Sequence, residues 1–397
     1  MKKRMYYIDN LRTTLIAYLI IEHLICIYSG VGWELMPDVQ RFGRAASDAF
    51  GFILMFQESY FLGVLFFIAG YFVVGSYERK GVFWFAKDRL LRLGLPALLT
   101  MLLISPITNG LLFGDVWYNP SLGFWAQINL LLNRVGVMWF AEALLVFSLV
   151  YGIAQSRLSQ KRIDSVKSLD AAGSIEPTPH SAGMAFTLRC EFGLILCIAV
   201  FAFLIRIWFS STRIVFGIRP GNFSSYIFLF VGGILARKGH LLAKLTYRHG
   251  LVWLAAGLFL GGGGGVALFI LGGGTEAFNV FGVRISGIEA FQGGLTWQSA
   301  AYTLWESFVA ISMTVGLLAL FKEKFNRGTR MSCALSADAF AVYMFHLPVV
   351  MAVATLAEPL PPPPIVKFVL LCVICVPLCF ALAHYVFRRI PVLGRLL

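Results

Sequence analysis

Long apolar segments separated by short polar ones follow one another along almost the whole chain. The 397 residues are 58% hydrophobic and only 13% charged, whereas a soluble domain carries roughly 25% charged residues. A helix of about 20 apolar residues crosses a bilayer, so ten such helices occupy roughly 200 to 250 residues. The sequence therefore predicts an all-α polytopic integral membrane protein. It excludes a soluble enzyme, a disordered chain and a fibrous repeat.

The hydropathy pattern predicts about ten transmembrane helices within a single domain over residues 1–397. One long polar segment, at about residues 155–187, is rich in Ser, Lys, Pro and Gly and is predicted to be a flexible cytoplasmic loop. The helices are expected at about residues 12–30, 49–75, 90–113, 123–153, 189–209, 223–238, 250–272, 298–321, 333–354 and 365–387.

The basic residues predict how the chain is oriented. It has 33 Lys and Arg against 20 Asp and Glu, a net charge of +13. Basic residues collect in the cytoplasmic loops of membrane proteins, so this excess needs no nucleic acid partner. Most of them fall in cytoplasmic segments if both termini are cytoplasmic, as we predict. The first apolar segment contains Arg12, Glu22 and His23 and lacks a small-residue cleavage site, so we predict a spanning helix rather than a signal peptide.

Arg12 and His23 are eleven positions apart in the first helix. At 100° per residue both side chains lie within about 20° of one face, and about 16 Å separates them along the axis. An ionisable residue inside a membrane indicates function by default. The spacing is equally consistent with Arg12 binding lipid phosphate and His23 bonding to a backbone carbonyl.

Two further motifs place polar groups at matching depths. Arg89 and Arg92 share a face at the cytoplasmic start of the third helix, and paired guanidinium groups suit phosphate; ordinary anchoring at the cytoplasmic rim is the alternative. His346, in the segment Tyr343 to His346, lies roughly 20 Å from the cytoplasmic end of the ninth helix. That depth is close to His23, so the two histidines can line one cavity. A packed histidine with a backbone partner is the alternative.

The remaining polar residues of the spans give weaker signals. Arg206, Arg213 and Arg219 are candidates for binding an anionic or polar acceptor at the outer end of the fifth helix. The carboxylates in predicted spans each need a partner or water at that depth, and spacing does not rank them: Glu22, Glu58, Glu142, Glu191 and Glu306. The cysteines provide no matching histidine set, so neither a metal site nor a disulfide is predicted.

Several motifs resemble the membrane acyltransferase family 3. Tyr7-Ile8-Asp9-Asn10-Leu11-Arg12, with His23 eleven residues on, is similar to its first-helix signature, and the Tyr-x-x-His segment ending at His346 is the other specific match. Supporting matches are Phe66 to Tyr71 (with Ala69 where Ser is frequent), Lys87 to Pro96, Trp139-Phe140, Phe230 to Leu235 and Gly294 to Trp297. The resemblance covers nearly the whole chain and looks closest to the branch called glucans biosynthesis protein C.

The resemblance implies a protein of a bacterial inner membrane that moves an acyl group, acetyl or succinyl, from cytoplasmic acyl-CoA to a hydroxyl of an extracytoplasmic glycan. Arg12, Arg89 and Arg92 are expected to hold the CoA phosphates. His23 is expected to be a general base, or to carry the acyl group briefly. Tyr343 or His346 is expected to stabilise the thioester oxyanion or to orient the acceptor.

Other functions fit the same residues. A transporter or exporter of an acyl group or small solute would use the same intramembrane His and Arg, although the inverted repeat of many transporters is not seen. A membrane protein that has lost catalysis, and an acyltransferase acting on lipid or peptide, are further alternatives. The sequence identifies neither the acyl group nor the acceptor nor the oligomeric state.

Overall fold

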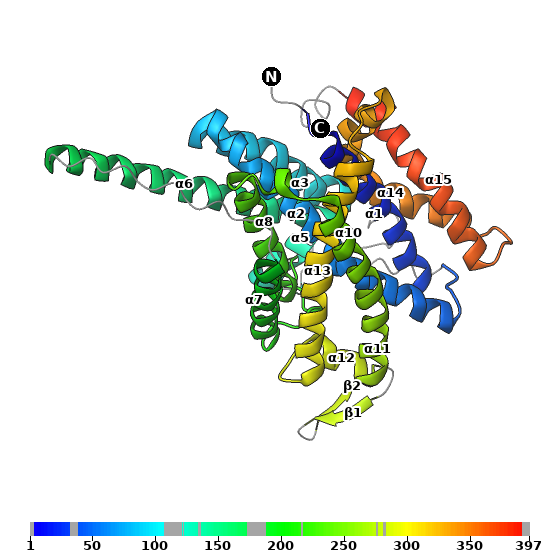
Figure 1. Cartoon of the computed structure of the whole chain (residues 1–397). Coiled ribbons are helices and arrows are strands. Elements are labelled where there is room, and N and C mark those ends of the chain that lie inside the picture. Colours follow the sequence, from blue (N-terminus) through cyan, green and yellow to red (C-terminus); the bar gives the residue numbers. More distant parts are fainter. Residues whose placement is uncertain are drawn as a thin grey trace.

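The protein is a bundle of long helices, seen in a computed structural model (Figure 1). The structure describes residues 4–31, 39–106, 121, 123–133, 136–172, 188–215, 217–274, 277–280 and 283–390. The first half of this part contains α1 (Tyr6–Ser29), α2 (Arg44–Arg89), α3 (Leu95–Leu99), α5 (Phe124–Asn133), α6 (Trp139–Ala172) and α7 (Leu188–Arg206). Two π-helical segments, Leu90–Gly94 and Thr100–Ile104, flank α3.

The second half begins with short helices and one hairpin. It contains α8 (Phe223–Lys238), α9 (Leu241–Lys244), α10 (Tyr247–Ala256), a π-helical segment (Gly257–Gly263), α11 (Gly264–Leu271), β1 (Ala277–Val280), β2 (Val283–Ser286) and α12 (Gly287–Gln292). The two strands pair antiparallel, with Ala277 opposite Ser286. Three long helices complete the described chain: α13 (Trp297–Lys324), α14 (Arg330–Ala357) and α15 (Pro364–Tyr385). Single 3-10 turns are formed by Gly136–Met138, Pro220–Asn222 and Phe387–Arg389.

The prediction of an all-α polytopic membrane protein is confirmed. In the described part, eight helical stretches are long and apolar enough to cross a bilayer. One of them, residues 44–104, combines the second and third predicted helices. The sixth predicted helix is α8, which has only 16 residues. Each of the ten predicted segments therefore contains helix.

The second and third predicted spans are joined by a bend instead of a loop. α2 has 46 residues and one break, at Gly81, where φ is 69° and ψ is 172°. Glycine adopts a positive φ without a steric penalty, so the helical path can change direction there. Lys80 and Asp88, on the two sides of the break, form an ion pair of 2.7 Å. The bend places the start of the third predicted span next to the end of the second.

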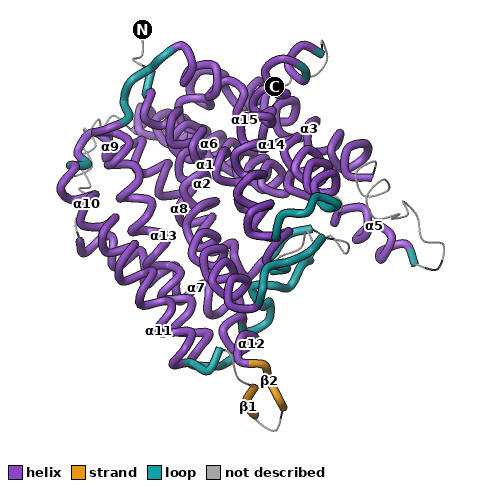
Figure 2. Tube along the Cα trace, turned by 90° about the vertical axis from the view of Figure 1, so that its right-hand side faces the viewer, coloured by secondary structure: helices purple, strands orange, loops and turns teal. Residues whose placement is uncertain are grey.

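α13 lies in the middle of the bundle and packs against α1, α2, α7 and α10 (Figure 2). α2 and α8 also pack backbone to backbone. A Cβ on Gly70 would clash with the Phe230 carbonyl oxygen, and one on Gly233 would clash with the Phe67 carbonyl oxygen. Small residues allow such close contact between membrane helices. Two motifs noted in the sequence therefore fix this helix pair.

α6 differs from the prediction at its C-terminal end. A flexible loop was expected at about residues 155–187, but the helix continues to Ala172, and Figure 1 shows it projecting from the bundle. Lys161, Asp164, Lys167 and Asp170 are spaced three apart in sequence. Opposite charges three or four residues apart generally favour helix formation, so this sequence pattern is compatible with a helix that continues to Ala172. Residues 173–187 lie outside the described part.

Both ends of the described chain lie at the same end of the bundle. Asn10, near the start of α1, donates from Nδ2 to the Phe325 carbonyl oxygen over 2.7 Å. Asp338, in the first half of α14, accepts from Nη1 of Arg388 over 2.6 Å. The β1–β2 hairpin lies at the opposite end (Figures 1 and 2). This arrangement agrees with an even number of crossings, and the cytoplasmic location of the termini stays a prediction.

Candidate functional site

Two neighbouring cavities lie inside the bundle. The arginine cavity, of about 460 Å³, is lined by the three arginines expected to bind phosphate, Arg12, Arg89 and Arg92. The histidine cavity, of about 170 Å³, is lined by His23. The two cavities share four lining residues, which are Ile16, Leu65, Phe140 and Tyr343.

α1 contributes one stripe of side chains to both cavities. Arg12 lines the arginine cavity, Ile16 lines both, and Leu19 and His23 line the histidine cavity. Positions three or four apart lie on one helix face. Arg12 and His23 therefore share a face, as their spacing predicts, and that face is turned toward the cavities.

The arginine cavity brings together residues from distant parts of the chain. Nη2 of Arg12 donates to the carbonyl oxygen and to Oγ of Ser336 in α14, over 3.1 and 3.0 Å. The guanidinium of Arg89 lies 5.1 Å from the ring centre of Phe85, and among the described residues its buried Nε has no hydrogen-bond partner. Nε of Arg92 pairs with Asp88 over 3.1 Å. The cavity thus presents three guanidinium groups, and the buried Nε of Arg89 is a donor that no described residue uses.

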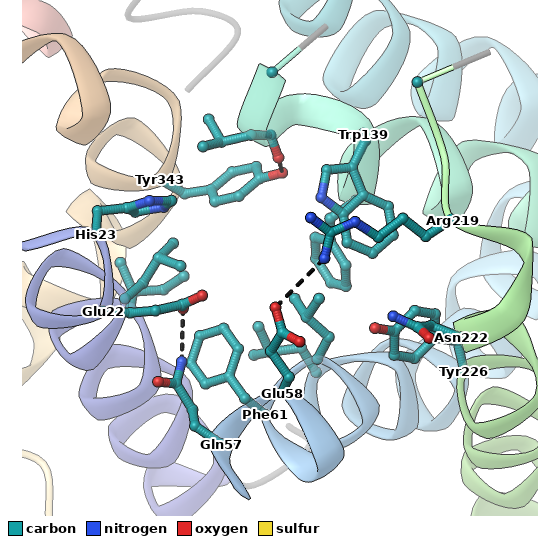
Figure 3. Close-up of a pocket in the computed structure, with 18 of the residues that line it drawn as sticks. Glu22, His23, Gln57, Glu58, Phe61, Trp139, Arg219, Asn222, Tyr226 and Tyr343 are labelled. Carbon is teal, nitrogen blue, oxygen red and sulfur yellow. Dashed lines mark hydrogen bonds and ion pairs between the residues drawn. The ribbon is translucent and has the colours of Figure 1, made fainter. Parts of the chain in front are cut away.

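Polar groups line the histidine cavity both beside His23, at Glu22 and Gln57, and across from it, at Glu58 and Arg219 (Figure 3). Nε2 of Gln57 donates to Oε2 of Glu22 over 2.6 Å. Nη1 of Arg219 lies 3.6 Å from Oε1 of Glu58. Asn222 also lines the cavity, as do the rings of Trp139 and Tyr226. The cavity therefore combines carboxylates, amides, one guanidinium and aromatic rings around the imidazole.

His346 lies behind His23 and does not line either cavity. The ring centres of the two histidines are 4.9 Å apart, which agrees with their predicted common depth. Nδ1 of His346 lies 2.8 Å from the Tyr343 carbonyl oxygen and 3.1 Å from that of Val342. Because carbonyl oxygens only accept hydrogen bonds, Nδ1 carries the proton and Nε2 is the acceptor. His346 therefore packs against the His23 ring, and among the described residues its Nε2 has no hydrogen-bond partner.

Tyr343 stands at the junction of the cavities, but its hydroxyl is already engaged. It donates to the backbone carbonyl of Val137, beside Gly136, whose φ is 53°. A phenol has a single proton to donate. In this structure Tyr343 therefore offers its ring to the cavities, and the expected oxyanion contact is not formed by its hydroxyl.

The three outer arginines have different surroundings. Arg206 is buried, and its Nη2 pairs with Glu306 over 2.7 Å and donates to Oδ1 of Asn222 over 2.9 Å. Arg213 donates to the Trp208 carbonyl oxygen over 3.1 Å. Of the three, Arg219 lines the histidine cavity.

Gln57 and Asn222 also line the histidine cavity, and the sequence did not predict them as site residues. A single amide in an apolar segment carries no spacing signal.

Comparison with known protein families agrees with this arrangement. Residues 5–384 match the family model described as Acyltransferase domain, of acyltransferase family 3. No curated protein and no solved structure matches the chain. The family match covers nearly the whole chain, including both cavities. The protein therefore belongs to acyltransferase family 3 and is a membrane acyltransferase.

Proposed function

We propose that this protein transfers an acyl group from cytoplasmic acyl-CoA to a hydroxyl of an extracytoplasmic glycan. The observation that carries the proposal is the pairing of the two cavities. One holds three guanidinium groups, the next holds a buried imidazole, and both reach Tyr343. A donor with phosphates at one end and a reactive thioester at the other fits this division. The resemblance to the glucans biosynthesis protein C branch supports a glycan acceptor and a bacterial inner membrane.

The arginine cavity suits the CoA part of the donor. Arg12, Arg89 and Arg92 supply positive charge and bidentate donors for phosphate. The rest of the cavity is mainly apolar, with Ile68, Phe72 and Leu93 among its lining residues. An extended pantetheine arm is of order 15 to 20 Å long, comparable with the rise of about 16 Å between Arg12 and His23. The thioester therefore reaches His23 while the phosphates stay with the arginines.

His23 is the proposed general base. It takes the proton from the acceptor hydroxyl while the hydroxyl oxygen attacks the thioester carbonyl carbon. The C–S bond then breaks, and CoA leaves as the thiol after receiving the proton from His23. A brief acyl-imidazole on His23 is the alternative route. His346 supports either route as a positioning residue, because its ring packs against that of His23, with ring centres 4.9 Å apart.

The histidine cavity suits a polyhydroxylated acceptor. Carboxylates and amides, here Glu22, Gln57, Glu58 and Asn222, hydrogen-bond hydroxyl groups. Trp139 and Tyr226, with ring centres 5.8 Å apart, offer apolar faces for a sugar ring. This combination supports a carbohydrate acceptor over a lipid chain.

The direct test is O-acylation in membrane vesicles, with radiolabelled acetyl-CoA or succinyl-CoA supplied on one side. Label on an extracytoplasmic glycan that is lost in His23→Ala is the expected result. Replacing Arg89 and Arg92 with Gln is expected to weaken acyl-CoA binding more than acceptor binding. Movement of a small solute without CoA or a covalent product would instead favour a transporter.

A further inference from the structure

The four residues shared by the two cavities separate the donor phosphate site from His23. We call Ile16, Leu65, Phe140 and Tyr343 the collar. Ile16, Leu65 and Tyr343 are buried, and Phe140 is half-buried. Arg12, Arg89 and Arg92 line the cavity on one side, and His23 lines the cavity on the other. An acyl group that travels from the arginines to His23 therefore passes between the collar side chains.

The collar is apolar and held in place by its neighbours. The Phe140 ring packs edge-on against Phe66, with ring centres 4.7 Å apart, and against Tyr343, with ring centres 6.0 Å apart. The one polar group of the collar, the Tyr343 hydroxyl, donates to the Val137 carbonyl. The collar consequently supplies no cation and no free donor to a charged group that enters it. A carboxylate at this depth would lose its hydration without gaining a partner.

The charges beyond the collar also disfavour an anionic acyl group. Glu22 and Glu58 line the histidine cavity, and Arg219, the cation there, is close to Glu58. Arg206 is paired with Glu306 in the buried region behind Asn222. The free carboxylate of a dicarboxylic acyl group would therefore lie close to other negative charges next to His23.

We propose that the collar selects a short, uncharged acyl group, of acetyl or propionyl size, and excludes dicarboxylic groups such as succinyl. This inference rests on the proposed acyl transfer and narrows its donor. The chemistry is unchanged: the acceptor oxygen forms an ester with the acyl carbon, the C–S bond breaks, and CoA leaves as the thiol. Selection falls on the acyl group, because the CoA part binds in the arginine cavity for every donor.

The test compares donors on the full protein reconstituted in vesicles. Acetyl-CoA, butyryl-CoA and succinyl-CoA are supplied in turn, with glycerol at high concentration as a minimal polyol acceptor. CoA thiol release is measured, and the rate of His23→Ala is subtracted. We expect kcat/KM to be about 100-fold or more higher for acetyl-CoA than for succinyl-CoA, since burying a carboxylate at this depth is costly. Equilibrium binding of the two donors is expected to be similar.

A matched pair of variants locates the selection. Leu65→Ala widens the collar, whereas Ile68→Ala, three residues further along α2, lines only the arginine cavity. Both remove the same number of apolar atoms, so they share the effects of lost packing. Leu65→Ala is expected to raise the butyryl-to-acetyl ratio of kcat/KM about tenfold, because hydrophobic pockets discriminate methylene groups by this order. Ile68→Ala is expected to leave the ratio unchanged.

The possible results distinguish a failure of the collar proposal from a failure of the proposed acyl transfer. Comparable kcat/KM for succinyl-CoA and acetyl-CoA, or an equal shift of the butyryl ratio in both variants, would overturn the collar while leaving acyl transfer intact. Absence of thiol release above His23→Ala with every donor would overturn the proposed function itself, and the collar with it.

Discussion

The Tyr343→Phe variant tests whether the hydroxyl at the junction of the two cavities takes part in the reaction. Its proton is used on the Val137 carbonyl, so Tyr343→Phe keeps the collar ring and removes only that bond. We expect kcat to fall less than about tenfold and stability to fall by about 1 to 3 kcal/mol, the cost of leaving a buried acceptor unpaired. Acyl transfer and thermal unfolding of the same preparation provide the check. A loss of about 100-fold or more in kcat at unchanged stability would identify the hydroxyl as an oxyanion donor.

Arg206 illustrates a buried charge that supports the site from outside it. It holds Glu306 and also binds the Gly221 carbonyl oxygen and the Asn222 side chain, over 3.0 and 2.9 Å. Arg206→Met leaves a buried carboxylate without its partner, which costs about 3 to 5 kcal/mol. The double variant with Glu306→Leu removes both charges and is expected to recover most of that loss. Thermal unfolding in detergent measures both, and identical midpoints for the single and double variants would contradict the pairing.

At the scale of elements, glycines determine how the π-helical segment and α11 pack on α13. A Cβ on Gly261 would lie 2.8 Å from Val309, and one on Gly265 would lie 2.7 Å from the Trp305 ring. Nε1 of Trp305 also donates to the Gly261 carbonyl oxygen over 2.7 Å. These glycines permit close helix contact, and the helix is π-helical over Gly257–Gly263.

Gly263, in the same segment, provides a control for these two glycines. Gly261→Ala and Gly265→Ala are expected to destabilise the protein by about 1 to 3 kcal/mol, because the added methyl overpacks the interface. Gly263 has nothing within 4 Å of its Cβ position, so Gly263→Ala is expected to be neutral or to stabilise by about 0.5 to 1 kcal/mol through helix propensity. Thermal unfolding of the three variants measures this order. Equal destabilisation by all three would show that backbone freedom, and not packing, is what these glycines provide.

At the scale of the whole molecule, orientation follows from the distribution of basic residues. The arginine cavity is expected to open toward the cytoplasm, and the β1–β2 hairpin is expected to lie outside. In a variant without native cysteines, Asn279→Cys should react with a membrane-impermeant thiol reagent in intact cells. Ser168→Cys, in the extension of α6, should react only after permeabilisation. The reverse labelling pattern would show that the protein has the opposite orientation in the membrane. It would then contradict donor entry from the cytoplasm.

The sequence by itself determined the helices and which residues share a face of one helix. Arg12 and His23 lie on a common face, and His23 and His346 lie at one depth, because rise and rotation per residue are local properties of a helix. The apolar spans were expected to be helical, because a helix satisfies its own backbone hydrogen-bonding groups inside a bilayer. The helical extension of α6 was missed, since hydropathy marks apolar spans and gives no signal for a polar helix.

Only the tertiary structure decided which helix faces meet. In a membrane, lipid is as apolar as the protein interior, so apolar periodicity does not show which face packs inward. Glycine contacts such as Gly70 with Phe230 hold α2 against α8, whereas α1, α2, α6 and α14 meet around the cavity that Arg12, Arg89 and Arg92 line. Tertiary contacts likewise committed the Tyr343 hydroxyl to Val137 and Arg206 to Glu306. Partners that are far apart in sequence leave no periodic trace, which is why a sequence that offers candidate site residues does not predict which side chains lie between them.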